Sequence, residues 1–291
     1  MKGRPMKMII MSNNLWNRDT NSDAWAARGE DCSADCRAEG LFRAYTAVMP
    51  DILGFQEMSR RMEMLILQRM RRVCLPDGTE AKYEIVTGGF VPILFRHDKL
   101  RLLESGHLLY PREFAPYPGS FNDSDSKGYT YGVFEERGSG KKIVVFTTHL
   151  WWKSDDPTNG SYQEGSAQAR ASQILTANEK ADALTAKYRC PAVLMGDMND
   201  MLGSPALNAA KNAGWQETHA LCTGERCDTR GYHYCFPDGW RHDPPGEYEK
   251  AIDHILIKNP KDTEIRRFCR FTEPFFEPLS DHFPVYIEIA L

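Results

Sequence analysis

Short apolar runs that stop abruptly at polar residues recur along the chain. The clearest run, residues 192–195, is followed by a glycine and then by Asp197 and Asn199. A short apolar run closed by a turn residue is typical of a buried strand, and the alternation of an extended chain places Asp197 and Asn199 on one side. A carboxylate and an amide need partners when they are buried. This strand end therefore favours a binding or catalytic role over a place in the core.

Similar patterns predict the other elements. Strands are expected at residues 7–12, 51–55, 83–87, 91–95, 129–135, 141–148, 251–257 and 285–291, with extended chain at 100–110. Helices are expected at residues 38–49, 59–74, 166–187 and 204–212. Loops or a broken helix are expected at residues 17–36, 111–128, 151–165 and 221–249. Hairpins interrupt the alternation of strands and helices, so we expect an α/β protein with two packed sheets and helices outside, rather than a doubly wound parallel sheet.

Composition and charge narrow the class of protein only slightly. The chain is 42% hydrophobic and 26% charged, which is ordinary for a globular protein. Its formal net charge is −4 and no basic block stands out, which disfavours non-specific binding to nucleic acid. No apolar stretch is long enough to cross a membrane, and residues 8–11 are too few for the core of a signal peptide. We therefore expect a monomer without stable membrane insertion, which is cytoplasmic or, if a signal peptide has been removed, secreted or periplasmic.

The eight cysteines form no Cys-x-x-Cys pair, which disfavours a structural zinc site. Cys32 with Cys36, and Cys222 with Cys227 and Cys235, lie in loop-like segments, where a local disulfide would be the alternative in a secreted form. Free thiols in a reducing compartment are the favoured expectation.

Six strand ends share the pattern of an apolar run followed by polar side chains. The polar positions are Asn14, Gln56-Glu57, His149, Asp197 with Asn199, Asp253, and Asp281-His282. Mg²⁺ prefers a few carboxylates together with water and substrate phosphate, which Glu57 and Asp281 could provide. A histidine can take a proton from water when a buried carboxylate fixes its tautomer, which His282 and Asp253 could provide. Each position alone is explained by a turn, a cap or a core histidine, but their joint occurrence favours an active site.

These ordered motifs resemble the endonuclease/exonuclease/phosphatase superfamily. The matching stretches cover nearly the whole chain and are Ser12-Asn13-Asn14, Gly54-Phe55-Gln56-Glu57, Thr148-His149-Leu150, Gly196-Asp197-Met198-Asn199, Ile252-Asp253-His254-Ile255 and Ser280-Asp281-His282. The resemblance implies a DNase I-like, four-layer α/β/β/α sandwich with two mixed sheets. It also implies metal-dependent cleavage of a phosphoester by one catalytic domain over residues 1–291, with insertions near 111–128 and 221–249.

The resemblance further implies a metal site. Glu57 would hold Mg²⁺, which Mn²⁺ could replace, and Asp281 would help directly or through water. Asn14 would contact the metal shell or the phosphate. Some nucleases of the superfamily have a carboxylate two residues after this asparagine, where the chain has Trp16. A single metal ion is therefore the simpler expectation.

The catalytic roles are implied in the same way. His149 and Asn199 would bind the phosphoryl oxygens. Asp197 would orient or deprotonate the attacking water. His282, steered by Asp253, would be the general base or would stabilise the transition state, and the sequence does not decide between Asp197 and His282 as the base.

Three further residues are candidates for substrate binding. Trp151 and Trp152 follow His149 directly, and aromatic faces stack on bases or sugars, so we expect one of the two to face the cleft. The alternative is that one packs inward and the other covers a loop. Arg170 lies in a long predicted helix, where relatives often have an arginine, and a surface ion pair is its alternative role.

The function predicted from these features is metal-dependent hydrolysis of a phosphodiester or phosphomonoester, such as a phospholipid headgroup, an inositol phosphate or a nucleotide. An endonuclease or exonuclease acting on DNA or RNA is the alternative. A third alternative is a catalytically inactive binding module of the same fold, against which the complete set of acids and histidines argues.

Overall fold

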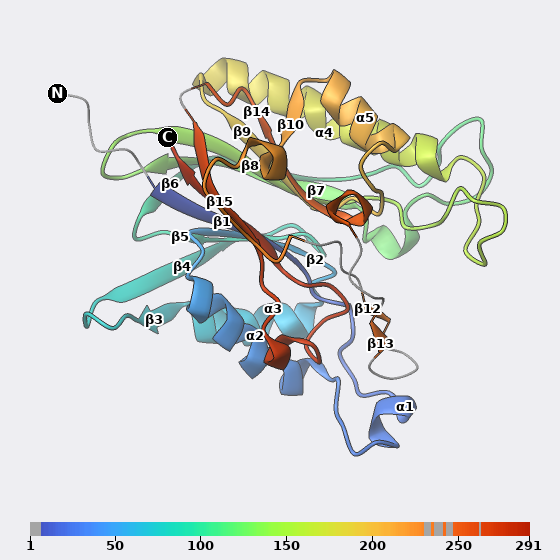
Figure 1. The fold of residues 1–291 in the computed structure, drawn as a ribbon, viewed down its shortest axis with the longest axis horizontal. Coiled ribbons are helices and arrows are strands. Elements are labelled where there is room, and N and C mark those ends of the chain that lie inside the picture. Colours follow the sequence, from blue (N-terminus) through green and yellow to red (C-terminus); the bar gives the residue numbers. More distant parts are fainter. Residues whose placement is uncertain (1–6, 230–233, 236–240, 243–246, 262) are drawn as a thin grey trace.

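The computed structural model describes residues 7–229, 234–235, 241–242, 247–261 and 263–291. Its two main β-sheets pack face to face, and a pair of helices covers the outside of each sheet (Figure 1). The predicted four-layer α/β/β/α sandwich is therefore confirmed.

The first sheet contains eight strands among the described residues, in the order β11-β15-β16-β1-β2-β5-β4-β3. They are β1 (Lys7–Asn14), β2 (Ile52–Gln56), β3 (Arg72–Cys74), β4 (Glu80–Val86), β5 (Ile93–Arg96), β11 (Glu225–Cys227), β15 (Glu264–Arg270) and β16 (Val285–Ala290). β1 and β2 are parallel, whereas β16 is antiparallel to β1, with Val285 opposite Ser12. The ends of β1 and β2 and the start of β16 therefore lie at one edge of the sheet.

The second sheet contains six strands in the described part of the chain, in the order β10-β14-β9-β8-β7-β6. They are β6 (Leu100–Leu109), β7 (Gly128–Glu136), β8 (Lys142–His149), β9 (Ala192–Asp197), β10 (Trp215–Glu217) and β14 (Asp253–Lys258). β8 and β9 are parallel, and the antiparallel β14 places Asp253 opposite Asp197. A short separate hairpin is formed by β12 (Tyr234–Cys235) and β13 (Arg241–His242).

Helices α2 (Ala34–Val48) and α3 (Arg60–Met70) cover the first sheet, and α4 (Ser166–Tyr188) and α5 (Pro205–Asn212) cover the second (Figure 1). Serine side chains accept a hydrogen bond from the first turn of α2, α3 and α5, which satisfies backbone N–H groups that have no partner within the helix. Two short helices are α1 (Asp23–Ala26) and α6 (Thr218–Leu221). None of the helices described here is long and apolar enough to span a membrane.

Three apolar clusters hold the layers together. The cluster between the sheets includes Ile10, Phe134, Val145, Val193 and Ile287, all buried. The other two clusters lie under α2 and α3 and under α4 and α5. Full burial of such a side chain contributes about 1.5–3 kcal/mol, so the sandwich provides a rigid support for groups at its edges.

The structure corrects three predicted boundaries. The predicted helix 59–74 ends at Met70, and Arg72–Cys74 is a strand because Val73 turns into the core while β3 pairs with β4. Of the two possibilities for residues 17–36, a loop or a broken helix, the structure has the broken helix, with α1 and the first turn of α2, which begins four residues earlier than predicted because Ser33 caps it. β14 begins at Asp253 rather than at residue 251.

Two of the cysteines differ from the expected free thiols. Cys227 and Cys269 form a disulfide between the paired strands β11 and β15. The alternative prediction, a disulfide between cysteines close in sequence, also missed this pair, because its members are 42 residues apart. Five cysteines are free, namely Cys32, Cys36, Cys74, Cys190 and Cys222, and the side chain of Cys235 lies outside the described part.

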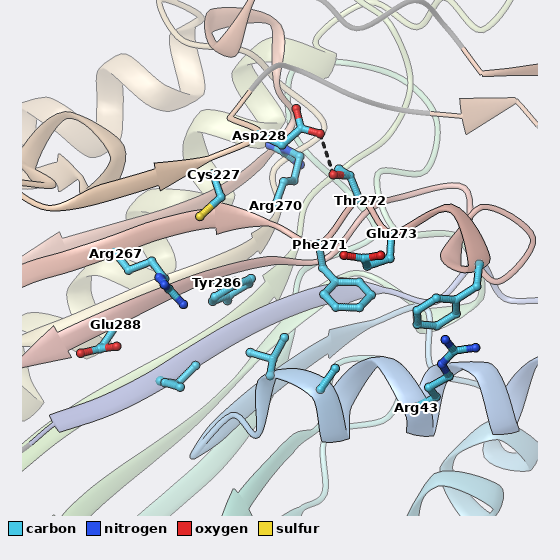
Figure 2. Close-up of a pocket in the computed structure, with 14 residues that line it drawn as sticks. Arg43, Cys227, Asp228, Arg267, Arg270, Phe271, Thr272, Glu273, Tyr286 and Glu288 are labelled. Carbon is cyan, nitrogen blue, oxygen red and sulfur yellow. Dashed lines mark hydrogen bonds between the residues drawn. The ribbon is translucent and has the colours of Figure 1, made fainter.

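A cavity of about 560 Å³ lies beside this disulfide, between β15, β16 and the end of α2 (Figure 2). Its wall includes Arg43, Arg267, Phe271 and Tyr286. Basic, acidic and aromatic side chains are mixed in the lining, so the cavity favours no single class of ligand.

Two of the predicted loops pack on each other. From the 151–165 loop, Gln163 Nε2 donates to the carbonyl oxygen of Ser120 at 3.2 Å, and Trp152 Nε1 donates to Asp123 Oδ2 at 3.3 Å. The 111–128 insertion is therefore a surface loop, as predicted, and it is held against the neighbouring 151–165 loop. Much of the predicted insertion at 221–249 lies outside the described residues, and the organisation as a single domain stays a prediction.

The buried Arg37 side chain joins the loop after β1 to the segment before His282. Its guanidinium donates five hydrogen bonds of 2.6–3.1 Å to carbonyl oxygens, which belong to Leu15, Trp16, Arg18, Cys32 and Leu279. Buried carbonyl oxygens are costly without a donor. Arg37 thus fixes two chain segments that both carry predicted site residues.

Replacing Arg37 by Met should lower the free energy of unfolding by about 3–5 kcal/mol, because the carbonyl oxygens lose their donors while they stay buried. Urea denaturation measures this change. Arg61→Met is the control, since Arg61 forms only an exposed ion pair with Asp35 and should change stability by less than about 1 kcal/mol. Equal effects of the two substitutions would contradict this role for Arg37.

Candidate active site

The predicted strand ends meet at one end of the sandwich. Asn14 and Gln56 end neighbouring parallel strands of the first sheet, and His149 and Asp197 end neighbouring parallel strands of the second. The sheets are linked there, because Asn14 Nδ2 donates to Asp197 Oδ2 at 3.0 Å. This contact joins side chains that are 183 residues apart in sequence.

Gly196 explains how Asp197 reaches its place. Its φ angle is +147°, and a Cβ atom at this position would lie 1.9 Å from the carbonyl oxygen of Thr148. Only glycine permits such a close approach of β9 to β8. The result is that Asp197 Oδ2 lies 3.4 Å from Nε2 of His149, its register partner.

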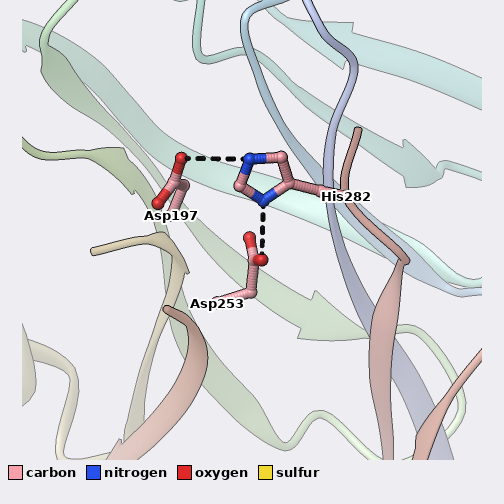
Figure 3. A group of neighbouring side chains, drawn as sticks. All are labelled: Asp197, Asp253 and His282. Carbon is pink, nitrogen blue, oxygen red and sulfur yellow. Dashed lines mark hydrogen bonds and ion pairs between the residues drawn. The ribbon is translucent and has the colours of Figure 1, made fainter. Parts of the chain in front are cut away.

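His282 lies between two buried carboxylates (Figure 3). Its Nδ1 is hydrogen-bonded to Asp253 Oδ2 at 2.8 Å, and its Nε2 lies 3.8 Å from Asp197 Oδ2. A carboxylate cannot donate, so Nδ1 carries a proton and the ring orientation is fixed. This is the arrangement expected for a histidine that exchanges a proton or stabilises charge through Nε2.

The charges in this group influence one another. Burial alone would lower the pKa of His282, but Asp253 and Asp197 raise it well above its usual value. Burial raises the pKa of Asp197 to about 6, with a further contribution from Asp253 and opposition from His282. Asp253 has a lowered pKa despite its burial, because His282 attracts and hydrogen-bonds its charged form. His282 is therefore positively charged at neutral pH in this arrangement, and Asp253 is its counter-ion.

Glu57 occupies the predicted metal-binding position just after β2. Its backbone is left-handed, with φ of +57°, and its Oε2 accepts from the Asn17 backbone at 2.9 Å. Asn14 Nδ2 donates to Glu57 Oε1 at 3.4 Å, while Asn14 Oδ1 accepts from the Trp16 backbone. Asn14 thus orients the carboxylates of Glu57 and Asp197 rather than presenting its own oxygen to a cation.

Asp281 is the second predicted metal ligand. Its Oδ1 is buried and has no hydrogen-bond partner among the described residues. Burial raises the pKa of Asp281 to about 7, and the neighbouring carboxylates of Glu57 and Asp197 act in the same direction. His282 Nε2 lies 4.0 Å from this oxygen, which is too far for a hydrogen bond, and its charge only partly opposes the pKa shift. A buried carboxylate oxygen without a donor, close to other carboxylates, fits a divalent cation as a further partner.

A second group could also hold a metal ion. Among the described residues, Asp197, Asp253 and His282 each offer a ligand atom, and these atoms lie within 4.8 Å of one another. However, the Nδ1 proton of His282 already occupies the space between that ring and Asp253. We therefore favour Glu57 and Asp281, rather than this group, as the ligands of the cation.

Lys127 is a residue of the site that the sequence prediction missed. It is 4% exposed, and its Nζ lies 2.5 Å from Nε2 and 3.2 Å from Nδ1 of His149. The prediction placed it in a surface loop. The hairpin of β7 and β8 could have revealed it, because their register puts Gly128 opposite His149.

Burial lowers the pKa of both Lys127 and His149, and the charge of Lys127 adds to the shift of His149. Burial lowers the pKa of Lys127 to about 8, although Glu57 and Asp197 oppose this shift. Burial, together with the charges of Lys127 and His282, lowers the pKa of His149 well below its usual value. His149 is therefore neutral, and the ring nitrogen that does not accept from Lys127 can donate to an oxyanion without adding charge.

Asn199 lies beside Asp197, as the alternation in sequence predicts. Its backbone N–H donates to Asp197 Oδ1 at 2.9 Å, and its side-chain amide donates to the carbonyl oxygen of Leu150 at 3.1 Å. With φ of +48°, it turns the chain sharply after the strand. In this arrangement Asn199 holds Asp197 in place, and its role in binding phosphoryl oxygens stays a prediction.

The two tryptophans after His149 differ in exposure. Trp151 is 0% exposed and packs against Phe121, so of the two tryptophans, one of which was expected to face the substrate, it is not the one that does. Trp152 is 45% exposed, and its indole edge is held by Asp123. Trp152 alone can offer an aromatic face to a bound molecule.

The predicted contact of Arg170 with substrate is also corrected. Its buried guanidinium bonds to Asp200 at 2.9 Å, to Asp155 at 3.2 Å and to the carbonyl oxygen of Lys153 at 2.7 Å. Its donors are committed to protein acceptors, so Arg170 positions the loops around the site from α4. The surface ion pair considered as its alternative does not describe this buried network either.

His254, next to Asp253 on β14, points to the other face of the sheet. Its Nε2 lies 3.0 Å from the carbonyl oxygen of Asp200, and its Nδ1 lies 3.2 Å from Glu217 Oε1. His254 therefore supports the loop after Asp197 from outside the cleft.

Several solved structures resemble this one. An endonuclease/exonuclease/phosphatase family protein of Bacteroides thetaiotaomicron has a TM-score of 0.74 at 20% identity, covering 99% of this chain and 96% of that chain. A mannosyl-6-phosphatase of the same organism has a TM-score of 0.71 at 21% identity, covering 98% and 100%. TDP2 of D. rerio, complexed with a single-strand DNA product, has a TM-score of 0.62 at 17% identity, covering 98% and 99%. No curated protein sequence matches the chain.

The sequence itself provides the stronger comparison. The sequence model of the Endonuclease/Exonuclease/phosphatase family matches residues 14–282, from Asn14 to His282. This match spans all of the converging strand ends, so the chain belongs to the Endonuclease/Exonuclease/phosphatase family and is an enzyme of this phosphoester-cleaving class.

Proposed function

We propose that the enzyme is a divalent-metal-dependent hydrolase that cleaves a phosphodiester or phosphomonoester by in-line attack of water. The observation that carries this proposal is the buried pair of His282 and Asp253, which faces Asp197 at the same strand ends as Glu57 and Asp281. A positively charged ring, a carboxylate beside it and two further carboxylates together provide what phosphoester hydrolysis requires.

Glu57 and Asp281 would hold one Mg²⁺ ion, or Mn²⁺ in its place, and Asn14 would orient Glu57 from behind. When bound, the ion supplies positive charge to a phosphoryl oxygen and to the developing transition state. Trp16, two residues after Asn14, offers no carboxylate for a second ion on this side.

The protein groups divide the remaining chemistry. Asp197 accepts a proton from the attacking water, because both of its oxygens are already oriented by Asn14 and Asn199. His282 is charged, so it donates from Nε2 to the phosphoryl group or leaving oxygen, and Asp253 stabilises that charge. His149 binds a phosphoryl oxygen at the opposite wall of the site.

One exposed aromatic residue near the site bears on the choice of substrate. Trp152 offers an aromatic face to the part of the substrate beyond the phosphate. A nuclease remains the second candidate, and the structural resemblance to the complex of TDP2 with DNA is its motivation. A panel of nucleic acid, lipid, inositol and sugar phosphoesters, assayed with Mg²⁺, Mn²⁺ or EDTA, tests both. Absence of metal-dependent turnover across the whole panel would refute the proposal.

Replacing Glu57 by Gln should weaken Mg²⁺ binding by at least about 10- to 100-fold, because the amide removes one anionic ligand. Calorimetric titration with Mg²⁺ measures the affinity directly, and the dependence of turnover on metal concentration gives a second value. Glu84→Gln, on an exposed part of β4, is the matched control and should leave both unchanged. Unaltered metal affinity in the Glu57 variant would move the cation site elsewhere.

Replacing Asp253 by Asn should lower kcat by about 10²–10⁴-fold with little change in KM, because His282 loses its fixed tautomer and its counter-ion. Steady-state kinetics on the preferred ester of the panel measure both constants. Asp77→Asn, in the exposed turn between β3 and β4, is the control. A normal kcat in the Asp253 variant would show that the pair does not serve the reaction.

A further inference from the structure

Lys127 is placed deep in the site by a dedicated local structure. It is the residue before β7, at the end of the 111–128 insertion. The buried Asn122 fixes its backbone, since Asn122 Oδ1 accepts from the Lys127 N–H at 2.9 Å and Asn122 Nδ2 donates to the Lys127 carbonyl oxygen, also at 2.9 Å. The same amide reaches the carbonyl oxygen of Tyr110 at 2.7 Å, which closes the neck of the insertion. The position of the ammonium group is therefore determined by the fold.

The ammonium group of Lys127 lacks an anionic partner. It can donate three hydrogen bonds, but the ring of His149 is its acceptor among the described residues. Glu57, Asp197 and Asp123 act on it only from a longer distance, since no ion pair within 4.0 Å joins them to Lys127 in the described structure. A buried cation without a paired anion is costly to the folded state. Its retention points to an anion that arrives with the substrate.

The surrounding donors indicate which anion this is. His149 Nε2 faces Asp197 at 3.4 Å and Glu57 at 3.9 Å on one side and Lys127 on the other. A phosphoryl group against His149 would thus meet the proposed cation on the Glu57 side and the ammonium group on the other side. The side-chain amide of Asn199 is committed to a carbonyl oxygen. With the Nε2–H of His282 directed at the leaving oxygen, the cation, the imidazole of His149 and the ammonium group of Lys127 make three contacts for non-bridging oxygens.

A phosphodiester has two non-bridging oxygens and one negative charge, whereas an ionised phosphomonoester has three such oxygens and two charges. Lys127 makes the third contact, and its positive charge adds to that of His282. These two features match the third oxygen and the second negative charge, which the monoester has and the diester lacks. Resting on the proposed phosphoesterase function, we propose that Lys127 binds the third non-bridging oxygen and makes the enzyme prefer dianionic phosphomonoesters to phosphodiesters.

Two esters with one leaving group test this preference, namely p-nitrophenyl phosphate and methyl p-nitrophenyl phosphate. Lys127→Met should lower kcat/KM for the monoester by about 10²–10³-fold, because a direct contact to the oxyanion is lost. The value for the diester should fall by no more than about tenfold, because only longer-range attraction is lost. Lys153→Met is the matched control for a nearby lysine outside the phosphate contact, and should change both esters by the same small factor.

Inorganic phosphate provides a readout that does not depend on turnover. Its affinity, measured by calorimetry in the presence of Mg²⁺, should fall by about 10- to 100-fold in the Lys127→Met variant. Lys127→Arg keeps the charge and should recover most of the preference for the monoester. Equal losses on the two esters, or an unchanged affinity for phosphate, would overturn the inference. Failure of the unmodified enzyme to cleave either ester with any metal would instead overturn the proposed phosphoesterase function.

The same variant has a predicted effect on stability. Burial lowers the pKa of Lys127 in the folded state from 10.5 to about 8, so below about pH 8 the folded protein holds a buried charge that the unfolded chain exposes to water. Without ligand, Lys127→Met should therefore be more stable than the unmodified protein below that pH. The difference should shrink as pH rises above about 8 and vanish well above 10.5, where the lysine is neutral in both states. Urea denaturation at several pH values, with Lys153→Met as control, measures it, and a difference independent of pH would contradict this electrostatic cost.

Discussion

Repulsion among carboxylates at one end of the sandwich is the constraint on which the site depends. Glu57, Asp197, Asp253 and Asp281 meet there, and His282 neutralises only part of their charge. Burial is the main reason why the pKa values of Asp197 and Asp281 are raised, and repulsion from the neighbouring carboxylates adds to it, because like charges repel more strongly as water is excluded. The protein alone does not balance this charge. A cation and a phosphate together would, because the cation meets the acids and the phosphate meets the positive side of the cleft.

The scaffold offsets the cost of assembling these groups. Apolar clusters hold the sheets face to face, so the strand ends cannot move apart to relieve the repulsion. Glu57 and Asn199 adopt left-handed backbone conformations at the ends of β2 and β9, and such conformations cost about 1–3 kcal/mol each. Strain of this kind persists only where the surrounding structure imposes it. Arg37 adds to this rigidity on the side of the first sheet, because its hydrogen bonds to the carbonyl oxygens of Leu15 and Leu279 fix two chain segments next to the site.

The sequence predicted the strand ends well because their information is local. An apolar run fixes a buried strand, and the polar residue after it is placed at the sheet edge, as for Asp197 and His149. Two packed sheets with helices outside followed from the order of these runs, and the four-layer sandwich followed from the resemblance to the superfamily. The direction in which a loop side chain points depends on contacts that are distant in sequence, and the predictions for such side chains failed. Trp151 turned inward, Arg170 turned toward the loops, and the partner of Cys227 came from another strand. Lys127 was missed because it lies at the end of a predicted loop, and the register of the hairpin of β7 and β8 is what brings it next to His149.

The amide of Asn122 has a consequence for how substrate choice could change. By joining both ends of the 111–128 insertion, it makes that segment a unit whose connection to the sheet is independent of its outer length. The bond-breaking groups lie on strand ends, whereas the positive charge of Lys127 is carried by the loop. The residues that recognise the phosphate ester and the residues that break its bond thus lie on separate segments of the chain. An exchange of this loop between relatives, in evolution or in the laboratory, could redirect the enzyme to another phosphate ester while leaving its reaction intact.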